Sequence, residues 1–525
     1  MHNRVVSKTV VSAGLLGAWA ALTCLACSSG SDAQSPTDTG AAADTGSGAD
    51  AGTPPASASV LERNNHPSRD GHFVQPLLTH AAAAKMALDP NFKADFTGAM
   101  WASPLYFEHG PNDKGVFIAV TTGNDVLALD ETSGAVVWMK NVGKPAPSNG
   151  VGCGNIHPLG ILATPVIDAT TRTIYISAAV GAQVIDADEV HALSIDDGSE
   201  RPGWPVNVSQ TLGFDPKPHN PRSALSLVNG IIYVAYGGHI GDCGDYRGRV
   251  VAIDSRDPTK VAGWATSGHG EAIWAAGGMA SDGNGVIAVT GNRTGAGGPH
   301  QDSEEVVRLT GMANLTRDDA NIFYPARWQG MDDGDADFGA ISPLIIEVPG
   351  ATPAKLVVAT SKDGHMYFLD PQKLGGMDGH LVDFPIATAV MAIRAVPTAY
   401  PTSKGVFVAL NIASTGMCSG MASGKVVLAA QIVPGAPVKP AIAWCAVSNS
   451  DASPIATTTD GRNDAVVWFM GGDQTLHAVD GESGAALGSA TGTCAGVRRW
   501  TSPIAVKGRI IVGGDGHLCA WAPTP

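Results

Sequence analysis

The chain has 525 residues, carries a formal net charge of −15 at pH 7, and contains 15% charged residues. Nucleic-acid binding needs clustered lysines and arginines, and the longest such run is Arg498-Arg499, so the composition excludes a nucleic-acid-binding protein. The 65 glycines and 34 prolines indicate many turns, and a fold that grows by adding repeats can hold this length as one unit.

The beginning of the chain has the pattern of an export signal. An apolar run at residues 10–22 follows two basic residues and is too short to span a bilayer. Leu25-Ala26-Cys27-Ser28 then resembles the cleavage box of bacterial lipoproteins, although Cys24 stands where such boxes usually carry leucine. We therefore predict a signal peptide at residues 1–27 and a lipid on Cys27, with an ordinary secretory signal cut further on as the alternative.

The next segment, residues 28–60, is rich in Ser, Thr, Ala, Gly and Asp and contains no Lys or Arg. Such a segment has almost no apolar surface to bury, so we predict a disordered tether between the membrane and the fold. The protein is accordingly expected in the bacterial cell envelope, anchored by its lipid at the outer membrane or the cell surface. A periplasmic or secreted location is the alternative.

A repeated phrase predicts the architecture. Apolar residues followed by a turn that contains Asp or Gly recur eight times, most clearly at residues 126–134 and 476–484. The weaker copies end at Ser194, Asp254, Thr310, Asp370, Ala430 and Ala522. A spacing of roughly 40–65 residues, with short strands and Gly-rich turns, is typical of a β-propeller. We predict an all-β, eight-bladed propeller at residues 61–525, or seven blades if the copy at Thr310 or Ala430 is an insertion.

Strand patterns divide the propeller into blades. Ser-Pro followed by apolar residues opens several of them, as at residues 103–105 and 342–344, because proline is tolerated at the first position of a strand. The expected blades span about 98–145, 156–210, 219–270, 272–330, 335–390, 392–448, 452–493 and 498–525. The eighth is too short for four strands, so we expect an N-terminal strand at residues 73–78 to complete it and close the ring.

Six cysteines remain beyond the two near the signal peptide. An even number of cysteines in an exported chain predicts disulfides, and six cysteines allow 15 pairings. Closeness in sequence favours Cys418–Cys445 and Cys494–Cys519, which leaves Cys153 with Cys243. None of the six belongs to a CxxC pair, so a zinc site is not expected.

The turn at residues 130–134, followed by Val136-Val137-Trp138, resembles the blade signature of the PQQ-like propeller superfamily. That superfamily includes quinoprotein alcohol dehydrogenases and lipoproteins that assist outer-membrane barrel assembly. The resemblance covers roughly residues 98–525. It implies the propeller fold, but it does not imply an activity, because the members include both enzymes and non-catalytic scaffolds.

Three segments also resemble the cofactor centre of the quinoprotein enzymes. Residues 241–248 resemble the segment with the calcium-ligating Glu, residues 282–292 the one ending in a calcium-ligating Asn, and residues 332–338 the one with the catalytic Asp. In such enzymes calcium polarises the quinone and an Asp takes the alcohol proton. The resemblance implies that Arg247, Trp274 and Asn292 contact the cofactor. It also implies that the metal ligands are Asn292, Asp333, Asp335 and Asp337, and that the three aspartates are the catalytic candidates.

The chain departs from that pattern at decisive positions. Cys243 stands at the position of the Glu ligand and is a poor ligand for calcium, which prefers oxygen. The chain has no vicinal Cys-Cys pair, and its acidic run does not align with the catalytic Asp without a shift of register. That run begins like an EF-hand loop, but Phe338 replaces the required Gly, and a solvated acidic turn is the alternative interpretation.

The predicted function is a lipid-anchored, non-catalytic binding or scaffold module. We expect a monomer without a cofactor that binds an envelope protein, a peptide or a glycan and contacts the membrane through its lipid. The alternative is an oxidoreductase that uses PQQ and calcium.

Overall fold

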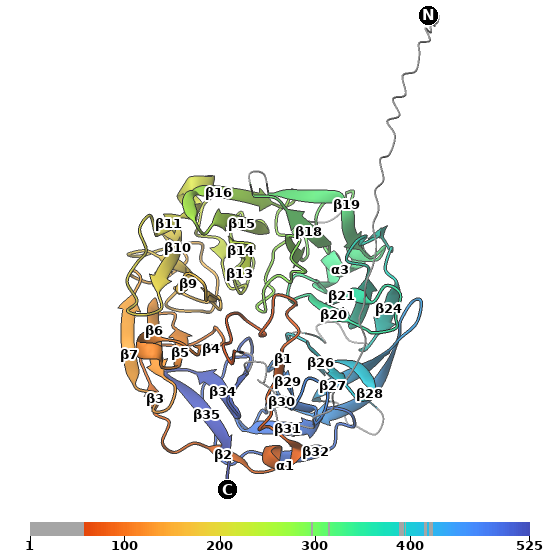
Figure 1. The fold of residues 1–525 in the computed structure, drawn as a ribbon. Coiled ribbons are helices and arrows are strands. Elements are labelled where there is room, and N and C mark those ends of the chain that lie inside the picture. Colours follow the sequence, from red (N-terminus) through yellow and green to blue (C-terminus); the bar gives the residue numbers. More distant parts are fainter. Residues whose placement is uncertain are drawn as a thin grey trace, which may run out of the picture. The chain divides into compact units, whose positions relative to one another are not determined.

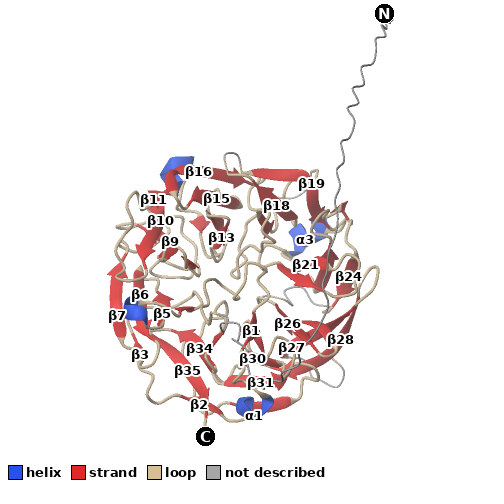
Figure 2. Cartoon of the chain, viewed as in Figure 1, coloured by secondary structure: helices blue, strands red, loops and turns tan. Residues whose placement is uncertain are grey.

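The computed structural model describes residues 57–525 except 296–297, 313–314, 388–392, 394, 414–416 and 419–423. The predicted signal peptide, Cys27 and most of the predicted tether lie outside the described residues. Eight sheets stand around a central axis (Figure 1), and strands make up most of the secondary structure (Figure 2). The eight-bladed all-β propeller is confirmed, and the seven-bladed alternative is wrong.

The strand bounds follow the predicted blades, except that the outer strand of blade four comes from within the span predicted for blade five. Blade one has β4 (Leu105–Phe107), β5 (Val116–Val120), β6 (Asp125–Asp130) and β7 (Val136–Asn141); blade two has β8 (Val166–Asp168), β9 (Thr173–Val180), β10 (Ala187–Ser194) and β11 (Val206–Asn207). Blade three has β12 (His219–Asn220), β13 (Ser226–Val228), β14 (Ile231–Gly238), β15 (Arg249–Asp254) and β16 (Asp257–Ala265). Blade four has β17 (Val286–Val289), β18 (Val306–Thr310), β19 (Thr316–Tyr324) and β23 (Gly376–Met377).

The second half of the ring repeats the same arrangement. Blade five has β20 (Leu344–Glu347), β21 (Lys355–Thr360), β22 (His365–Leu369) and β24 (Val382–Pro385); blade six has β25 (Thr398–Thr402), β26 (Gly405–Ala413), β27 (Lys425–Val433) and β28 (Lys439–Val447). Blade seven has β29 (Ile455–Thr458), β30 (Val466–Met470), β31 (Leu476–Asp480) and β32 (Ala486–Ser489). The helices are α1 (His80–Ala83), the 3-10 turn Pro111–Asp113, α2 (Val208–Leu212) and α3 (Trp328–Gly334).

Two local features explain why these residues form blades. Strands in the middle of a blade are apolar in succession because both of their faces pack against neighbouring blades, and all five residues of β5 are buried. The repeated turn is held by its aspartate: Asp130 Oδ1 accepts from the backbone N–H of Ser133 at 2.8 Å, and Asp480 Oδ1 accepts from that of Ser483 at 2.8 Å. In these two copies the repeated phrase therefore contains the residue that stabilises its own turn.

The N-terminal region closes the ring, but with a different strand from the predicted one. Blade eight has β33 (Ile504–Val506), β34 (Arg509–Gly514) and β35 (His517–Pro523), and β2 (Met86–Leu88) pairs antiparallel with β35, as does β3 (Ala94–Asp95). Residues 73–78 do not close it, because β1 (His72–Val74) runs parallel to β29 in blade seven. The prediction failed because β1 directly follows a segment at the axis, whereas the missing strand lies at the rim.

That axial segment, residues 60–71, is called the axial plug here. It crosses the centre of the ring (Figure 1) and bonds to every blade. Its partners, from blade one to blade eight, are Tyr106, Ile167, Leu225, Ser281, Ile345, Ala399, Ala456 and Ser502. Residues 57–60, placed in the predicted tether, already contact blade one: Val60 pairs with Tyr106, and the N–H of Ala58 donates to Glu108.

The structure pairs the six cysteines as expected from their spacing. Cys418–Cys445 lies in blade six, Cys494–Cys519 joins blades seven and eight, and Cys153–Cys243 joins the loop after blade one to the β14–β15 loop. His517 lies near Cys494 and Cys519, with ligand atoms within 4.8 Å of one another. The two sulfurs form a disulfide, so this group does not offer thiolates to zinc.

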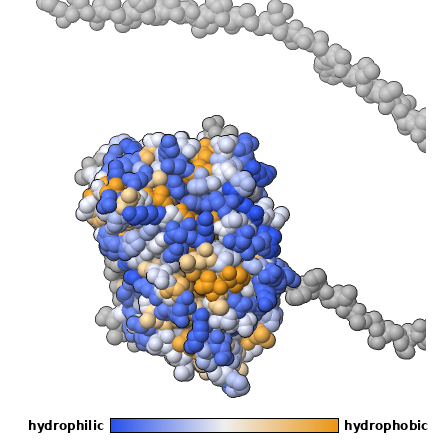
Figure 3. Space-filling model, turned by 90° about the vertical axis from the view of Figure 1, so that its left-hand side faces the viewer, coloured by the Kyte–Doolittle hydropathy of each residue, from blue (hydrophilic) through white to orange (hydrophobic). Residues whose placement is uncertain are grey.

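The rim of blade one carries exposed apolar side chains. Val136, Val137 and Met139 on β7 are 48%, 45% and 62% exposed. Figure 3 looks onto the side of the ring that carries β7, and apolar side chains gather near the middle of that side. Among the described residues, no helix is both long enough and apolar enough to cross a membrane.

Candidate functional site

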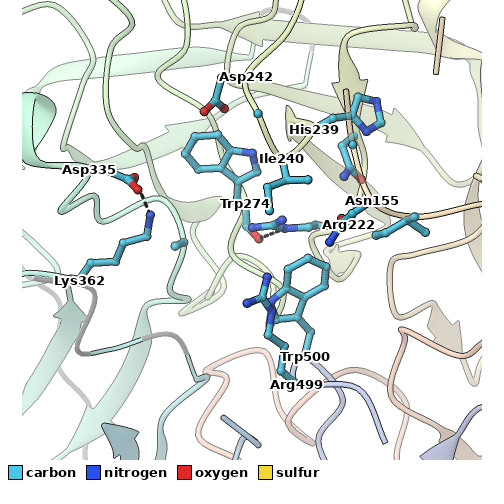
Figure 4. A pocket seen from close by; sticks show the side chains of 15 residues that line it. Asn155, Arg222, His239, Ile240, Asp242, Trp274, Asp335, Lys362, Arg499 and Trp500 are labelled. Atoms are coloured by element: carbon cyan, nitrogen blue, oxygen red, sulfur yellow. Dashed lines mark hydrogen bonds and ion pairs between the residues drawn. The ribbon is translucent and has the colours of Figure 1, made fainter. Parts of the chain in front are cut away.

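A cavity of about 210 Å³ lies near the axis of the propeller (Figure 4). Its walls come from loops of blades far apart in sequence. The lining residues are Gly154, Asn155, Ile156, Asn220, Arg222, His239, Ile240, Gly241, Asp242, Trp274, Asp335, Ala340, Lys362, Arg499 and Trp500. Arg63 of the axial plug donates to the carbonyl of Trp500, so the plug supports one wall of the cavity.

Arg222 lies between two tryptophans of the cavity (Figure 4). Its Nε donates to the carbonyl oxygen of Trp274 at 2.9 Å, and its guanidinium carbon is 4.1 Å from the ring centroid of Trp500. Arg499 lies over the same ring at 4.8 Å. Burial, and then the charge of Arg499, lower the pKa of Arg222 to about 9, so the Arg222 guanidinium group remains charged at neutral pH.

The terminal nitrogens of Arg222 have no hydrogen-bond partner among the described residues. The side-chain oxygen of the buried Asn220 likewise has none. A buried charge is costly unless an opposite charge or hydrogen bonds compensate it. The cavity therefore offers a cation and an acceptor that a bound molecule can satisfy.

A lysine and two aspartates form the other side of the site. Lys362 Nζ is 2.8 Å from Asp335 Oδ1 and 2.6 Å from Asp337 Oδ2. Burial raises the pKa of the fully buried Asp337 to about 6, against the opposing effect of Lys362. Burial and the charge of Asp337 also raise the pKa of Glu304, which accepts from the backbone N–H of Phe338 at 2.8 Å. The positive charge of Lys362 therefore offsets Asp335 and Asp337, and the acidic cluster continues from Asp337 to the buried Glu304.

The structure brings only some of the predicted site residues together. Trp274 and Asp335 line the cavity, and Asp337 reaches it through Lys362. Asp333 is exposed on α3, and Arg247 donates to the carbonyls of Thr266 and Ser267 away from the cavity. Asn292 is not among the lining residues; its backbone carbonyl accepts from the N–H of Glu271 at 2.8 Å.

Four lining residues carry the charge and the aromatic surface but were not predicted as a site. They are Arg222, Lys362, Arg499 and Trp500. The only signal in the sequence was the Arg498-Arg499-Trp500 run, which combines the longest basic run with an aromatic residue. Arg222 and Lys362 belong to no sequence motif, so only the tertiary structure shows that they line the same cavity.

The disulfide between blades one and three forms part of the wall. Cys153 is followed by Gly154, and Cys243 is preceded by Gly241 and Asp242, and these three neighbours line the cavity. The backbone N–H of Gly154 also donates to the carbonyl of Ile240 at 2.9 Å. The bridge and this hydrogen bond therefore join the two loops beside the cavity.

These residues do not fit a calcium–quinone centre. Cys243 is bonded to Cys153 and offers no oxygen, although calcium binds six to eight oxygen ligands. Asp335 and Asp337 are both bound to the ammonium group of Lys362, and Asn292 does not line the cavity. Two guanidinium groups in the same cavity further disfavour a divalent cation.

The comparisons with solved structures support the propeller fold. No protein-family model and no curated protein sequence matches the chain. Among solved structures, the quinohemoprotein alcohol dehydrogenase from Comamonas testosteroni has a TM-score of 0.62 and 15% identity, covering 88% of this chain and 80% of that one.

Two further enzymes have the same architecture. The quinohemoprotein alcohol dehydrogenase ADHIIG from Pseudomonas putida HK5 has a TM-score of 0.61 and 13% identity, covering 89% of this chain and 80% of that one. A europium-containing methanol dehydrogenase has a TM-score of 0.56 and 13% identity, covering 86% and 89%. At these identities the likeness is one of fold.

The buried carboxyl groups near the site predict how stability depends on pH. Burial raises the pKa of Glu271 to about 6 and that of Glu305 to about 7, besides that of Asp337. At pH values between the ordinary pKa of these carboxyl groups and their raised pKa, the groups therefore bind more protons in the folded protein than in the unfolded chain. The contribution of these carboxyl groups to stability should therefore fall as the pH rises from about 4.5 to about 7, whereas the contribution of His72, His219 and His239, whose pKa burial lowers to about 4, should rise up to about pH 6.5.

Thermal unfolding at pH 5.0 to 7.5 measures this effect. Glu271→Gln keeps the acceptor for Gly268, and its melting temperature should gain on that of the wild type as the pH rises from 5 to 7.5, because the variant has lost a group that destabilises the fold when it ionises. A difference between the two proteins that does not change with pH would contradict the prediction.

Proposed function

We propose that the protein is a non-redox binding module of the cell envelope that holds a carboxylate-bearing ligand in its axial cavity. The observation that carries this proposal is Arg222, a charged, largely enclosed guanidinium whose terminal nitrogens have no hydrogen-bond partner among the described residues. Carboxylates match the two parallel donors of a guanidinium group. The predicted export signal and the predicted lipidation at Cys27 support the proposed envelope location and lipid anchor.

The surroundings of Arg222 favour an organic acid over a simple ion. Trp274 and Trp500 supply flat apolar surface, and the unpartnered oxygen of Asn220 accepts a hydrogen bond from a hydroxyl or N–H group. A cavity of about 210 Å³ holds one sugar acid or one acidic residue, not a long chain. The ligand is accordingly the acidic end of a glycan or of a peptide or protein, with the rest outside the cavity.

Binding assays with two carboxylates test the proposal. Glucuronate represents an acidic glycan, an N-acetylated peptide with a free C-terminal carboxylate represents a protein end, and glucose is the neutral comparison. One of the two acids should stabilise the protein against thermal unfolding in a concentration-dependent way. Arg222→Met should weaken binding about 10–100-fold, because a charge-assisted hydrogen bond contributes about 1.5–3 kcal/mol.

Arg256→Met is the matched control. Arg256 is 72% exposed and pairs with Asp254 on the surface, so its loss should leave binding unchanged. Equal binding by wild type and Arg222→Met, or no response to either acid, would refute the cavity as an anion site.

The alternative function, an oxidoreductase with PQQ and calcium, has its own test. The purified protein is mixed with PQQ and calcium, and its absorption spectrum is recorded. A stoichiometric quinone signal that disappears in Asn292→Ala would replace the binding module with the enzyme. We expect no such signal, because the residues at the cavity do not supply a calcium site.

A further inference from the structure

The axial cavity is lined by a carboxylate as well as by the guanidinium group of Arg222. Asp242 lies in the loop between β14 and β15 and belongs to the cavity wall (Figure 4). Its Oδ1 accepts from the hydroxyl group of Tyr246 at 2.7 Å, and no described cationic side chain forms an ion pair with it. The cavity therefore presents a negative charge to a ligand in addition to a positive one.

The position of Asp242 is fixed by its backbone. Its N–H donates to the carbonyl of His239 at 3.0 Å, and the next residue, Cys243, is bonded to Cys153. A φ of 53° places Asp242 in the left-handed region, which aspartate and asparagine tolerate better than most residues do. The carboxylate is therefore held at a defined place on the cavity wall.

Arg222 is fixed on another part of the same wall. Its Nε donates to the carbonyl of Trp274 at 2.9 Å, and its backbone N–H donates to the carbonyl of Asn220 at 3.0 Å. Although both residues line one cavity of about 210 Å³, the described Arg222 and Asp242 do not form an ion pair with each other. Two opposite charges that line a cavity without contact leave space for a molecule that contacts both.

Apolar surface connects the two charges. Trp274 accepts from Arg222, and its ring centroid lies 6.2 Å from that of Tyr246, the residue that binds Asp242. Ile240, which is 54% exposed, also lines the cavity two residues before Asp242. A ligand whose charged groups are joined by a short hydrocarbon segment matches this surface, because the segment is removed from water there.

We propose that the ligand of the axial cavity is a zwitterion, either a free amino acid or the terminal residue of a peptide, whose carboxylate binds Arg222 and whose ammonium group binds Asp242. This inference rests on the proposed function, which assigns the carboxylate contact. Ammonium and carboxylate groups form charge-assisted hydrogen bonds, and a zwitterion leaves the net charge of the cavity unchanged. The buried side-chain oxygen of Asn220 offers a further acceptor for the three N–H groups of an ammonium ion.

A series of ω-amino acids from glycine to 6-aminohexanoate tests the inference, each compared with the unsubstituted acid of the same chain length. Isothermal titration calorimetry measures the dissociation constants. At least one amino acid should bind about 10–100-fold more tightly than its matched acid, because its ammonium group adds a charge-assisted hydrogen bond. The chain length that binds most tightly then reports the separation between Arg222 and Asp242.

Asp242→Asn distinguishes the ammonium contact from the carboxylate contact. Asparagine tolerates the left-handed backbone and keeps an acceptor for Tyr246, so the melting temperature without ligand should be preserved. The variant should lose the advantage of the amino acid and should bind the matched acid no more weakly than the wild type does. Asp245→Asn is the matched control: Asp245 lies in the same loop, is 83% exposed and does not line the cavity, so the advantage should remain.

Equal affinities for amino acid and matched acid at every chain length would overturn the inference and leave the carboxylate site of the proposed function intact. An advantage that persists in Asp242→Asn would also overturn it. Tighter binding of glucuronate than of every amino acid in the series would assign the cavity to a glycan instead. If neither the acids nor the amino acids bind, the proposed function fails and the inference fails with it.

Discussion

Arg69→Met should lower the free energy of unfolding by about 3–5 kcal/mol, the usual cost of removing one partner of a buried ion pair. Arg69 is fully buried in the axial plug, and its Nη1 is 2.9 Å from Glu62 Oε2, an ion pair without hydrogen-bond alignment. Its other nitrogens donate to the carbonyls of Met279 and Leu225 at 3.0 and 2.9 Å. Methionine would remove the Arg69 donor to the Leu225 carbonyl, one of the two donors to the Met279 carbonyl, and the charged partner of Glu62.

Urea unfolding measured by tryptophan fluorescence gives the change. The double variant Glu62→Gln/Arg69→Met should recover part of the loss, because it removes the uncompensated carboxylate. Arg256→Met, on the surface, should change stability by less than about 0.5 kcal/mol. If Arg69→Met unfolds at the wild-type urea concentration, the axial plug does not hold the blades together.

Cys153→Ser should destabilise the protein and also weaken ligand binding. The disulfide joins residues 90 positions apart, and the chain-entropy model assigns a loop of this size about 4–5 kcal/mol. Because Gly154 and Gly241 line the cavity beside the bridge, its loss frees two walls of the site. We therefore expect a lower melting temperature, a titratable thiol at Cys243, and weaker binding of the carboxylate ligand.

Cys494→Ser provides the comparison. Its bridge to Cys519 spans 25 residues and does not border the cavity, so the variant should lose about 3–4 kcal/mol and keep its affinity. Unchanged melting of Cys153→Ser, together with a free thiol at Cys243 in the wild type, would show that this pairing is wrong. Unchanged affinity alone would show that the loops hold their positions without the bridge.

The blades could be predicted because a local pattern of apolar residues and a turn recurs along the chain. The turn after Asp130 and the turn after Asp480 form through hydrogen bonds within three residues, so the repeat is visible before any tertiary contact is known. The disulfides of blades six to eight join cysteines 27 and 25 residues apart, so closeness in sequence favoured them. The third pair then followed by elimination.

The closing strand could not be assigned in the same way. Residues 73–78 and Met86–Leu88 are both short and partly apolar, and local pattern does not distinguish the axis from the rim. The axial plug was also missed, because polar residues with left-handed backbone, such as Asn64 and Asn65 at φ 58° and 69°, are typical of an exposed loop. Only pairing with all eight blades makes this segment a core element.

The sequence by itself predicted a propeller, favoured eight blades and the disulfide pairs that the structure shows, and revealed the departure from a calcium–quinone centre at Cys243. These features depend on periodicity and residue chemistry, which are readable along the chain. The tertiary structure decided the site: it brings Arg222, Lys362 and Trp500 around one cavity, although they come from blades three, five and eight. Closing the ring creates these contacts, and no local pattern encodes them.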